Sequence, residues 1–446
     1  MKRVRIILSA IVLANGLVSE AQNKSLTLDE IFKLADENNP QIAASAQSVN
    51  EAYESQSVAR NAKLPDIDVS ASISYIGNAW VADRDFSNGA DYNTPHFGNG
   101  VDITISQLLY AGGGVKRNIE IAELSHEIAT LAHSNTRQMV RLNLANSYLE
   151  LCKLLNHKQI IEQNIERTKL LLNDIKANYE AGTALKSDIT RHDLMLKNLE
   201  MKLVSTNCTI EILNRQLTQN IGLENGTTII PDTTFLQHVS NNYGNTDWAT
   251  STNDKFDVQL MEAAMHAPQV VASEKSAEVA KVAEEAAHAP MRPTIALRLE
   301  DKLEGPITYE IPTLDMNVNY WYAGIGVSYN VGNVYKQRRV IKQKQVAKNV
   351  AEERHRNVVN NYKCAVHAAN VRLQEAKENK GTKEQSLVLA KENYENVHYR
   401  YVNGMALITD ILDASNQQLE AELSLANSRI EIAEAHVLLM ALIGQL

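Results

Sequence analysis

The chain has 446 residues, a formal net charge of −9 at pH 7 and 44% hydrophobic residues. Its three cysteines, Cys152, Cys208 and Cys364, are too few and too scattered for a disulfide framework, and we expect them to be small buried side chains. Beyond the first 21 residues no stretch approaches 18 uninterrupted apolar residues, which excludes a transmembrane helix there. We expect no nucleic-acid partner.

Residues 1–21 have the pattern of a secretory signal peptide. Three basic residues within the first five precede an apolar core from Ile6 to Val18, and small residues follow up to Ala21. The alternative, an N-terminal anchor helix, is disfavoured because the apolar run is short for a membrane span. Because no cysteine follows the cleavage site, we expect an exported chain without a lipid anchor, starting near Gln22.

The first helix is expected to begin after Thr27, because Glu30 follows at the spacing of a capping box, and to break at the Asn39-Pro40 pair. A strand is expected next, over 66–80. Its opening stretch, DIDVSASISY, alternates strictly between polar and apolar residues, which predicts a strand with one apolar face and one polar face in contact with water. A second alternating strand is expected over 99–111.

A very long helix follows the strands. Neither Gly nor Pro occurs from Lys116 to Ala181, which allows a helix of close to 100 Å at about 1.5 Å per residue. Its counterpart runs from about Tyr335 to Asn403, with one weak point at Gly381. Apolar residues recur every seven residues on these helices and on the final one. This spacing predicts coiled-coil packing of long helices side by side. These residues are Ile165, Leu172 and Tyr179, then Leu387, Tyr394 and Tyr401, then Leu412, Leu419, Ala426 and Ala433.

The chain repeats itself. NYEAGTALKSDI, which starts at Asn178, aligns with RYVNGMALITDI, which starts at Arg400, at an offset of 222. Further upstream the offset becomes 228, which places Pro65 over Pro293, and the shift of six falls between the two strands of each half. Self-similarity of this kind indicates two copies of one structural unit.

We therefore divide the mature chain into a first repeat over 22–240, with long helices to 221, and a second repeat over 241–446. Each repeat reads helix, strand, strand, helix, helix. The strands of the second repeat are expected over 293–302 and 318–332. The solvent loops of the two strand pairs are expected over Val81–Gly98 and Asp301–Asn317.

The strand positions predict a surface that faces lipid. Apolar side chains share one parity and polar side chains the other, and aromatic residues lie near the strand ends, where a membrane barrel has its girdles. The lipid-facing residues are expected to be Ile67, Val69, Ile73, Ile103, Ile105, Ile325 and Val327. Four strands cannot close a barrel, because the smallest membrane barrels have about eight, so several chains must contribute. The alternative is a soluble sheet covered by helices.

The order of motifs in this duplicated unit resembles the TolC-type outer-membrane efflux channels over essentially the whole mature chain. The motifs are Asn39-Pro40 and Leu64-Pro65 before the first strand, Gln107 to Gly113 (QLLYAGG) after the second, two Tyr-x-x-Gly tips, and Asp410-Ile-Leu-Asp413-Ala414 in the last helix. The resemblance implies a mainly α protein with a transmembrane β-barrel. It implies a homotrimer with four strands per chain, a 12-stranded barrel and a long coiled-coil α-helical tunnel that extends into the periplasm.

The resemblance also implies functional positions at the helix tips. Gly182 and Gly404 would form tips where a periplasmic adaptor protein docks, and Asp188 and Tyr401 match gate positions. Asp410 and Asp413 match an acidic ring at the periplasmic entrance.

Two features of these positions stay open. Asp410 and Asp413 lie three apart, hence on one helix face, and a trimer would gather six carboxylates that attract cations; the alternative is that they are ordinary carboxylates at a helix N-terminus. The best-known members place an Arg where this chain has Ala406, so their Asp–Arg latch is absent.

Signatures of catalysis are missing from the sequence, since there is no Walker A motif, no GxSxG and no HExxH. We expect no enzyme activity, no cofactor and no bound metal, and we expect the twelve histidines to be solvated. The function indicated is a passive outer-membrane exit duct for drugs or other small molecules, driven by an inner-membrane pump through the adaptor. The alternatives are a type I protein-secretion duct and a periplasmic coiled-coil structural protein.

Overall fold

The computed structural model describes residues 23–224, 226–232, 254–310 and 313–446, so the signal peptide expected over 1–21 lies outside the described residues. The chain forms two compact units. The first comprises Met1–Ala46, Ala132–Val270 and Val359–Leu446, and the second comprises Gln47–Leu131 and Val271–Val358. Each unit contains parts of both sequence repeats, so the repeat boundaries stay a prediction.

The helices confirm the breaks that were predicted from single residues. Helix α1 (Leu28–Asn38) begins with the expected capping box, in which the Glu30 N–H donates to Thr27 Oγ1 at 3.3 Å and the Thr27 N–H donates to Glu30 Oε2 at 2.8 Å. Helix α2 (Pro40–Asn61) follows at once, because Asn39 is extended and its side-chain oxygen accepts from the Gln41 N–H at 2.9 Å.

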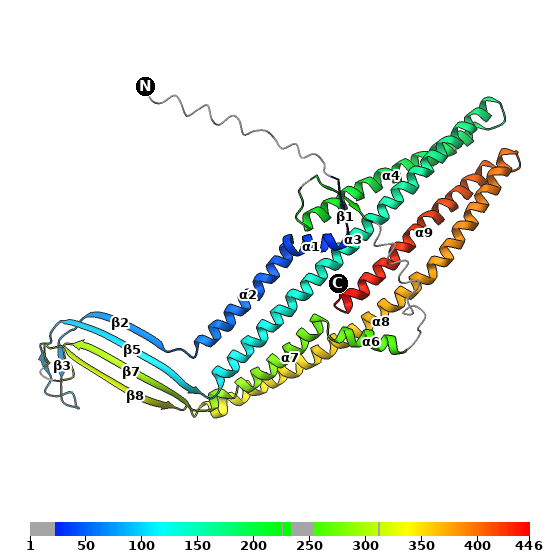
Figure 1. Ribbon diagram of the computed structural model, residues 1–446. Coiled ribbons are helices and arrows are strands. Elements are labelled where there is room, and N and C mark those ends of the chain that lie inside the picture. The colour runs from blue at the N-terminus through cyan, green and yellow to red at the C-terminus, as the bar shows by residue number, and fades with distance from the viewer. Residues whose placement is uncertain (1–22, 225, 233–253, 311–312) are drawn as a thin grey trace, which may run out of the picture. The chain divides into compact units, whose positions relative to one another are not determined.

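The four long helices also agree with the sequence pattern (Figure 1). Each repeat has one very long helix and one shorter helix that returns beside it. The bounds are α3 (Gly114–Glu180), α4 (Lys186–Asn220), α8 (Asn333–Val402) and α9 (Ile408–Leu442). At 67 and 70 residues, α3 and α8 end within two residues of the predicted limits, and Gly381 does not interrupt α8. Shorter helices complete the set: α6 (Asp254–Met265), α7 (Pro268–Ala286) and the 3₁₀ helix η1 (Ala289–Met291).

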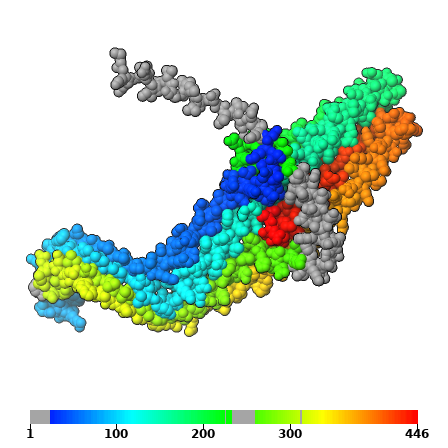
Figure 2. Space-filling view, viewed as in Figure 1, coloured from blue at the N-terminus to red at the C-terminus, as the bar shows by residue number. Residues whose placement is uncertain are grey.

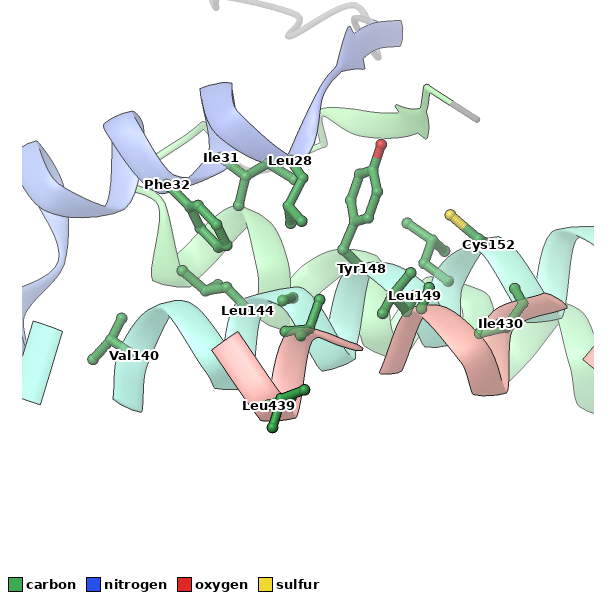
Figure 3. Close-up of a cluster of buried hydrophobic side chains, with 14 of the residues drawn as sticks. Leu28, Ile31, Phe32, Val140, Leu144, Tyr148, Leu149, Cys152, Ile430 and Leu439 are labelled. Atoms are coloured by element: carbon green, nitrogen blue, oxygen red, sulfur yellow. The ribbon is translucent and has the colours of Figure 1, made fainter. Parts of the chain in front are cut away.

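The first unit has its core where α1 crosses α3 (Figure 3). Tyr148 of α3 is fully buried there, and its hydroxyl donates to the backbone carbonyls of Leu26 and Asp232, at 3.0 Å each. These carbonyls belong to or follow a two-stranded parallel sheet of β1 (Asn23–Leu26) and β6 (Thr228–Pro231), which the sequence analysis did not predict. Burial raises the pKa of Tyr148 well above its ordinary value, so the hydroxyl stays a donor.

The cysteine prediction was right for one of three residues. Cys152 packs in this core, and burial raises the pKa of its thiol to about 12. Cys208 and Cys364 are exposed on α4 and α8. Scattering along a helix pattern does not say which face a single residue occupies.

The seven-residue recurrence marks real packing, with one exception. A second cluster buries Ile165 and Leu172 of α3 against Leu196 and Leu199 of α4 and Leu419 of α9. Ala433 is also fully buried, whereas Tyr179, near the end of α3, is exposed.

The second unit holds a four-stranded antiparallel sheet in the order β2-β5-β7-β8. Its strands are β2 (Asp66–Tyr75), β5 (Phe97–Ala111), β7 (Thr294–Gly305) and β8 (Val318–Ser328). The two predicted strand pairs are the hairpins β2–β5 and β7–β8, and β5 pairs with β7 between them. Within the described residues neither edge strand, β2 or β8, has a second neighbour.

Two predicted strands end earlier than expected. The strand predicted over 66–80 stops at Tyr75, because the chain turns at Gly77, whose carbonyl accepts from Thr94 Oγ1 at 2.6 Å. The loop predicted over 81–98 holds part of a small hairpin, β3 (Ala79–Val81) with β4 (Ala90–Tyr92). The strand predicted to 332 stops at Ser328, whose partner Thr294 is the first residue of β7.

The apolar face of the sheet is exposed, which contradicts the alternative of a soluble sheet covered by helices. Ile73 on β2 and Ile325 on β8 are 79% and 68% exposed. The other predicted lipid-facing residues share this face by register: Val69 pairs with Ile103, Ile67 with Ile105, and Val327 with Ile295. None of the helices in the described part of the chain has an apolar stretch long enough to cross a membrane.

Candidate functional site at the paired helix tips

The candidate site is built on two helix–helix turns that have the same backbone conformation. Gly182 follows α3 and Gly404 follows α8, with φ of +79° and +71°. At each turn the glycine N–H bonds a carbonyl three residues back and the next N–H bonds one five residues back, as Thr183 bonds Asn178 at 2.9 Å and Met405 bonds Arg400 at 2.8 Å. This is the Schellman pattern, whose left-handed residue is usually glycine because a Cβ is disfavoured there.

The helix after each turn begins with an aspartate in the same role. Asp188 accepts from the Leu185 N–H and Asp410 accepts from the Leu407 N–H, both at 3.0 Å. The two aspartates are related by the offset of 222, although the sequence analysis gave them different functions. The capping role that stayed open for Asp410 is thus present, and a carboxylate in this position also benefits from the helix dipole.

Asp410 and Asp413 lie on the exposed face of α9, as their spacing predicted. The opposite face buries Ile411 and Ala414. Asp413 accepts from Gln417 Nε2 at 3.0 Å, one turn further along. The pair is therefore available to solvent, and the carboxylate ring itself stays a prediction because it requires three copies.

The two tips are joined by a small apolar cluster. Leu171 and Ile175 of α3 pack with Ile408 and Ile411 of α9, and Tyr401 lies at the margin of this cluster. Figure 2 shows both tips on the surface, side by side. The cluster fixes the end of α3 against the start of α9.

The structure brings together the two residues that the sequence proposed as a gate. Burial raises the pKa of Tyr401, and the carboxylates of Asp188 and Asp174 raise it further. Tyr401 belongs to α8 and Asp188 to α4, so the proposed gate joins the two halves of the chain. The tyrosine stays a neutral hydrogen-bond donor at physiological pH.

A buried histidine beside this pair was missed. His192 is 1% exposed and follows Asp188 by one turn of α4; burial lowers its pKa, and Asp188 opposes that change. The prediction that all histidines are solvated was wrong here and for His436, which is buried in the contact of α9 with α8. The available signal was spacing, since His192, Leu196 and Leu199 lie at i, i+4 and i+7 on one buried face.

Each tip also exposes large apolar side chains. Leu185 and Leu407, which precede the two aspartates, are 69% and 70% exposed, and Val402 and Met405 are exposed beside Gly404. Grouped exposed apolar residues mark contact surfaces for other molecules. The tips therefore combine a rigid turn with an apolar surface and flanking carboxylates.

Comparison with known proteins identifies the family. The family model described as outer membrane efflux protein matches residues 31–222 and 260–445. The outer membrane protein TolC of Salmonella enteritidis is 23% identical, over 96% of this chain and 83% of that protein.

Solved structures agree in fold. The outer membrane protein VceC of Vibrio cholerae matches with a TM-score of 0.74 and 14% identity, over 94% of this chain and 96% of that one. The CmeC outer membrane channel of Campylobacter jejuni matches with a TM-score of 0.75 and 15% identity, over 94% and 85%. The chain belongs to the outer membrane efflux protein family.

Proposed function

We propose that three copies of this outer-membrane efflux channel form a passive exit duct for drugs or other small molecules. One observation carries the proposal: in the part of the chain that the structure describes, the sheet has two open edges and an exposed apolar face, so a single copy is incomplete. Three four-stranded sheets make a 12-stranded barrel, which lies within the even-numbered range of membrane barrels. The apolar face meets lipid and removes from water the surface that a lone copy exposes.

The opposite face of the sheet lines the water-filled lumen. It carries Ser70, Ser72 and Ser74 on β2 and Asp102 and Thr104 on β5, opposite charged residues of β7. Small and charged side chains hold water and leave room for cargo, so they set a broad charge preference instead of a specific binding site.

The paired tips form the periplasmic end of the duct. A periplasmic adaptor docks on the apolar surface around Gly182 and Gly404, and an inner-membrane pump supplies the energy. Asp410 and Asp413 of three copies form the acidic entrance, and Tyr401 with Asp188 holds the tip closed without an arginine at Ala406. The family is one of channels, and the proposal includes no catalytic step.

Ion selectivity tests the acidic entrance. Purified trimers in planar bilayers should conduct with a preference for cations, and Asp410→Ala with Asp413→Ala should weaken that preference. Glu420→Ala is the control, because it removes an exposed carboxylate of the same helix, α9, away from the tip. Unchanged selectivity in the double variant, or an equal change in the control, would refute the entrance ring.

A complementation experiment separates efflux from protein secretion. In a bacterium that lacks its own channel, this chain with its matched adaptor and pump should restore drug resistance. Restoration of a secreted protein in the medium, with no gain in resistance, would favour the type I secretion duct.

A further inference from the structure

The second unit contains an internal seam where the hairpin of one repeat meets that of the other. β5 pairs antiparallel with β7, with Ile103 opposite Asp301 and Ile105 opposite Leu299. The helices beside this seam are joined by two ion pairs. Arg117 of α3 contacts Glu285 of α7 at 2.7 Å, and Lys275 of α7 contacts Glu127 of α3 at 3.1 Å.

The two edge strands of the same sheet are the repeat counterparts of the two strands that meet at the seam. By the repeat offsets, β8 corresponds to β5 (222) and β2 to β7 (228). Copying the internal register onto the edges places Ile325 opposite Ile73 and Val327 opposite Ala71, so apolar residues meet apolar residues. A shift of one residue would place each apolar side chain on the polar face.

The helices follow the same correspondence. Arg117 corresponds to Arg339 on α8, and its partner Glu285 corresponds to Ser57 on α2. Helices α8 and α2 run in opposite directions. Lys342, which is three residues after Arg339, therefore lies level with Glu54, which is three residues before Ser57. The internal seam therefore predicts that an α8 cation meets an α2 carboxylate of the next copy.

Side-chain exposure selects the same residues without using the repeat. One face of α2 packs on α3, through the Tyr53–His126 ring contact and the Arg60–Glu123 ion pair. The face away from α3 is exposed and its charged groups are both carboxylates. We name it the acidic stripe: Gln47, Glu51, Glu54 and Val58.

Helix α8 has a matching face. It packs on α7 through the Lys348–Glu284 ion pair at 2.9 Å and a hydrogen bond from Gln337. The face away from α7 is exposed, and its charged groups are both cations. We name it the basic stripe: Tyr335, Arg339, Lys342 and Val346. Both stripes have the spacing i, i+4, i+7, i+11, and Val346, 51% exposed, corresponds to Leu124, which is buried beside the internal seam.

We propose that the acidic stripe of one copy docks on the basic stripe of the next copy, alongside a β8–β2 ladder in the register of the internal seam. The partner is a second copy of this chain, and the contact is head-to-tail, the kind that closes into a ring when three copies complete one full rotation. The proposal rests on the proposed trimeric channel and adds which residues meet. The residues after Ser328 have no cross-strand partner on β7. They gain one on β2 of the next copy, where Tyr329 lies opposite Val69.

A disulfide tests the strand register. In a Cys208→Ser, Cys364→Ser parent, which keeps the buried Cys152, Ser70→Cys with Ser328→Cys should give covalent trimers on non-reducing gels. Residues directly opposite lie about 4.5–5.5 Å apart, within disulfide range. Within one chain β2 and β8 are separated by two strands, about 14 Å apart, so the bond forms only between copies.

The matched control moves one cysteine by two residues on the same face, as Ser72→Cys with Ser328→Cys, and should remain largely uncrosslinked because diagonal neighbours are about 7–8 Å apart. A covalent trimer in the control, with none in the test variant, would overturn the register.

Charge reversal tests the stripes. Glu54→Lys and Lys342→Glu should each lower the temperature at which the trimer band dissociates on gels, and the double reversal should regain most of the loss. A double variant no better than the sum of the single variants overturns the docking. Bilayer conductance of the parent separates the two proposals. A conducting parent with failed crosslinks contradicts the seam alone, whereas a parent that neither trimerises nor conducts contradicts the channel.

Discussion

Gly112, in the QLLYAGG motif, is the position where a single methyl group should do most harm. Its φ is +64°, and an added Cβ would overlap the carbonyl oxygen of Ala289 in η1. The left-handed backbone costs an alanine about 1–2 kcal/mol. The overlap forces a backbone shift, which adds about 1–3 kcal/mol. Gly112→Ala should therefore destabilise the strand-to-helix junction by roughly 2–5 kcal/mol.

The neighbouring glycine supplies the control. Gly113 has φ of +88°, and the nearest atom to its added Cβ is the Arg292 guanidinium at 3.7 Å. Gly113→Ala therefore carries the backbone cost without the overlap. We expect the temperature of trimer dissociation to fall in the order parent, Gly113→Ala, Gly112→Ala, and the outer-membrane level to follow. Equal losses in both variants would refute the overlap, and a Gly112→Ala trimer as stable as the parent would refute the reasoning.

Three further predictions concern the first unit. Tyr148→Phe removes the hydroxyl that donates to two backbone carbonyls and should cost about 0.5–1.5 kcal/mol, measured as a lower melting temperature by circular dichroism; an unchanged midpoint contradicts it. Burial, with Lys377 nearby, lowers the pKa of His436 to about 4, so the unfolded chain takes up the proton first as pH falls. Stability should thus drop between about pH 6.5 and 4, by roughly 3 kcal/mol in all, and His436→Leu should flatten this slope; an equally steep slope in the variant contradicts the assignment. Gly404→Ala places its Cβ in open space, so it should cost only about 1–2 kcal/mol and speed hydrogen exchange at the tip alone; faster exchange in the core would contradict a local effect.

The long elements could be predicted from sequence because one strong signal governs each. The absence of Gly and Pro placed α3 within two residues, and strict alternation placed the interior of β2. Strand ends failed because they depend on a neighbour: β8 stops at Ser328, where β7 begins. The β1–β6 sheet was missed because four-residue strands about 200 positions apart carry no periodicity.

The candidate site was predicted in part. The pairing of Asp188 with Tyr401 came from the family resemblance, and the structure places the two residues near each other. The shared capping role of Asp188 and Asp410 could have been read from their offset. The burial of His192 and the exposure of Cys208 could not be judged one residue at a time, because side-chain direction depends on which helix packs alongside.

The open sheet edges have a consequence for biogenesis. A newly exported copy can complete the core around Tyr148 alone, but the outer edges of β2 and β8 find hydrogen-bond partners only after other copies arrive. Maturation therefore depends on how often the copies meet. Low expression prolongs the lifetime of the aggregation-prone monomer, and overexpression favours aggregation through the same unpaired strand edges. A chaperone that covers these edge strands during export would raise the yield of assembled channel without contacting any part of its conducting path.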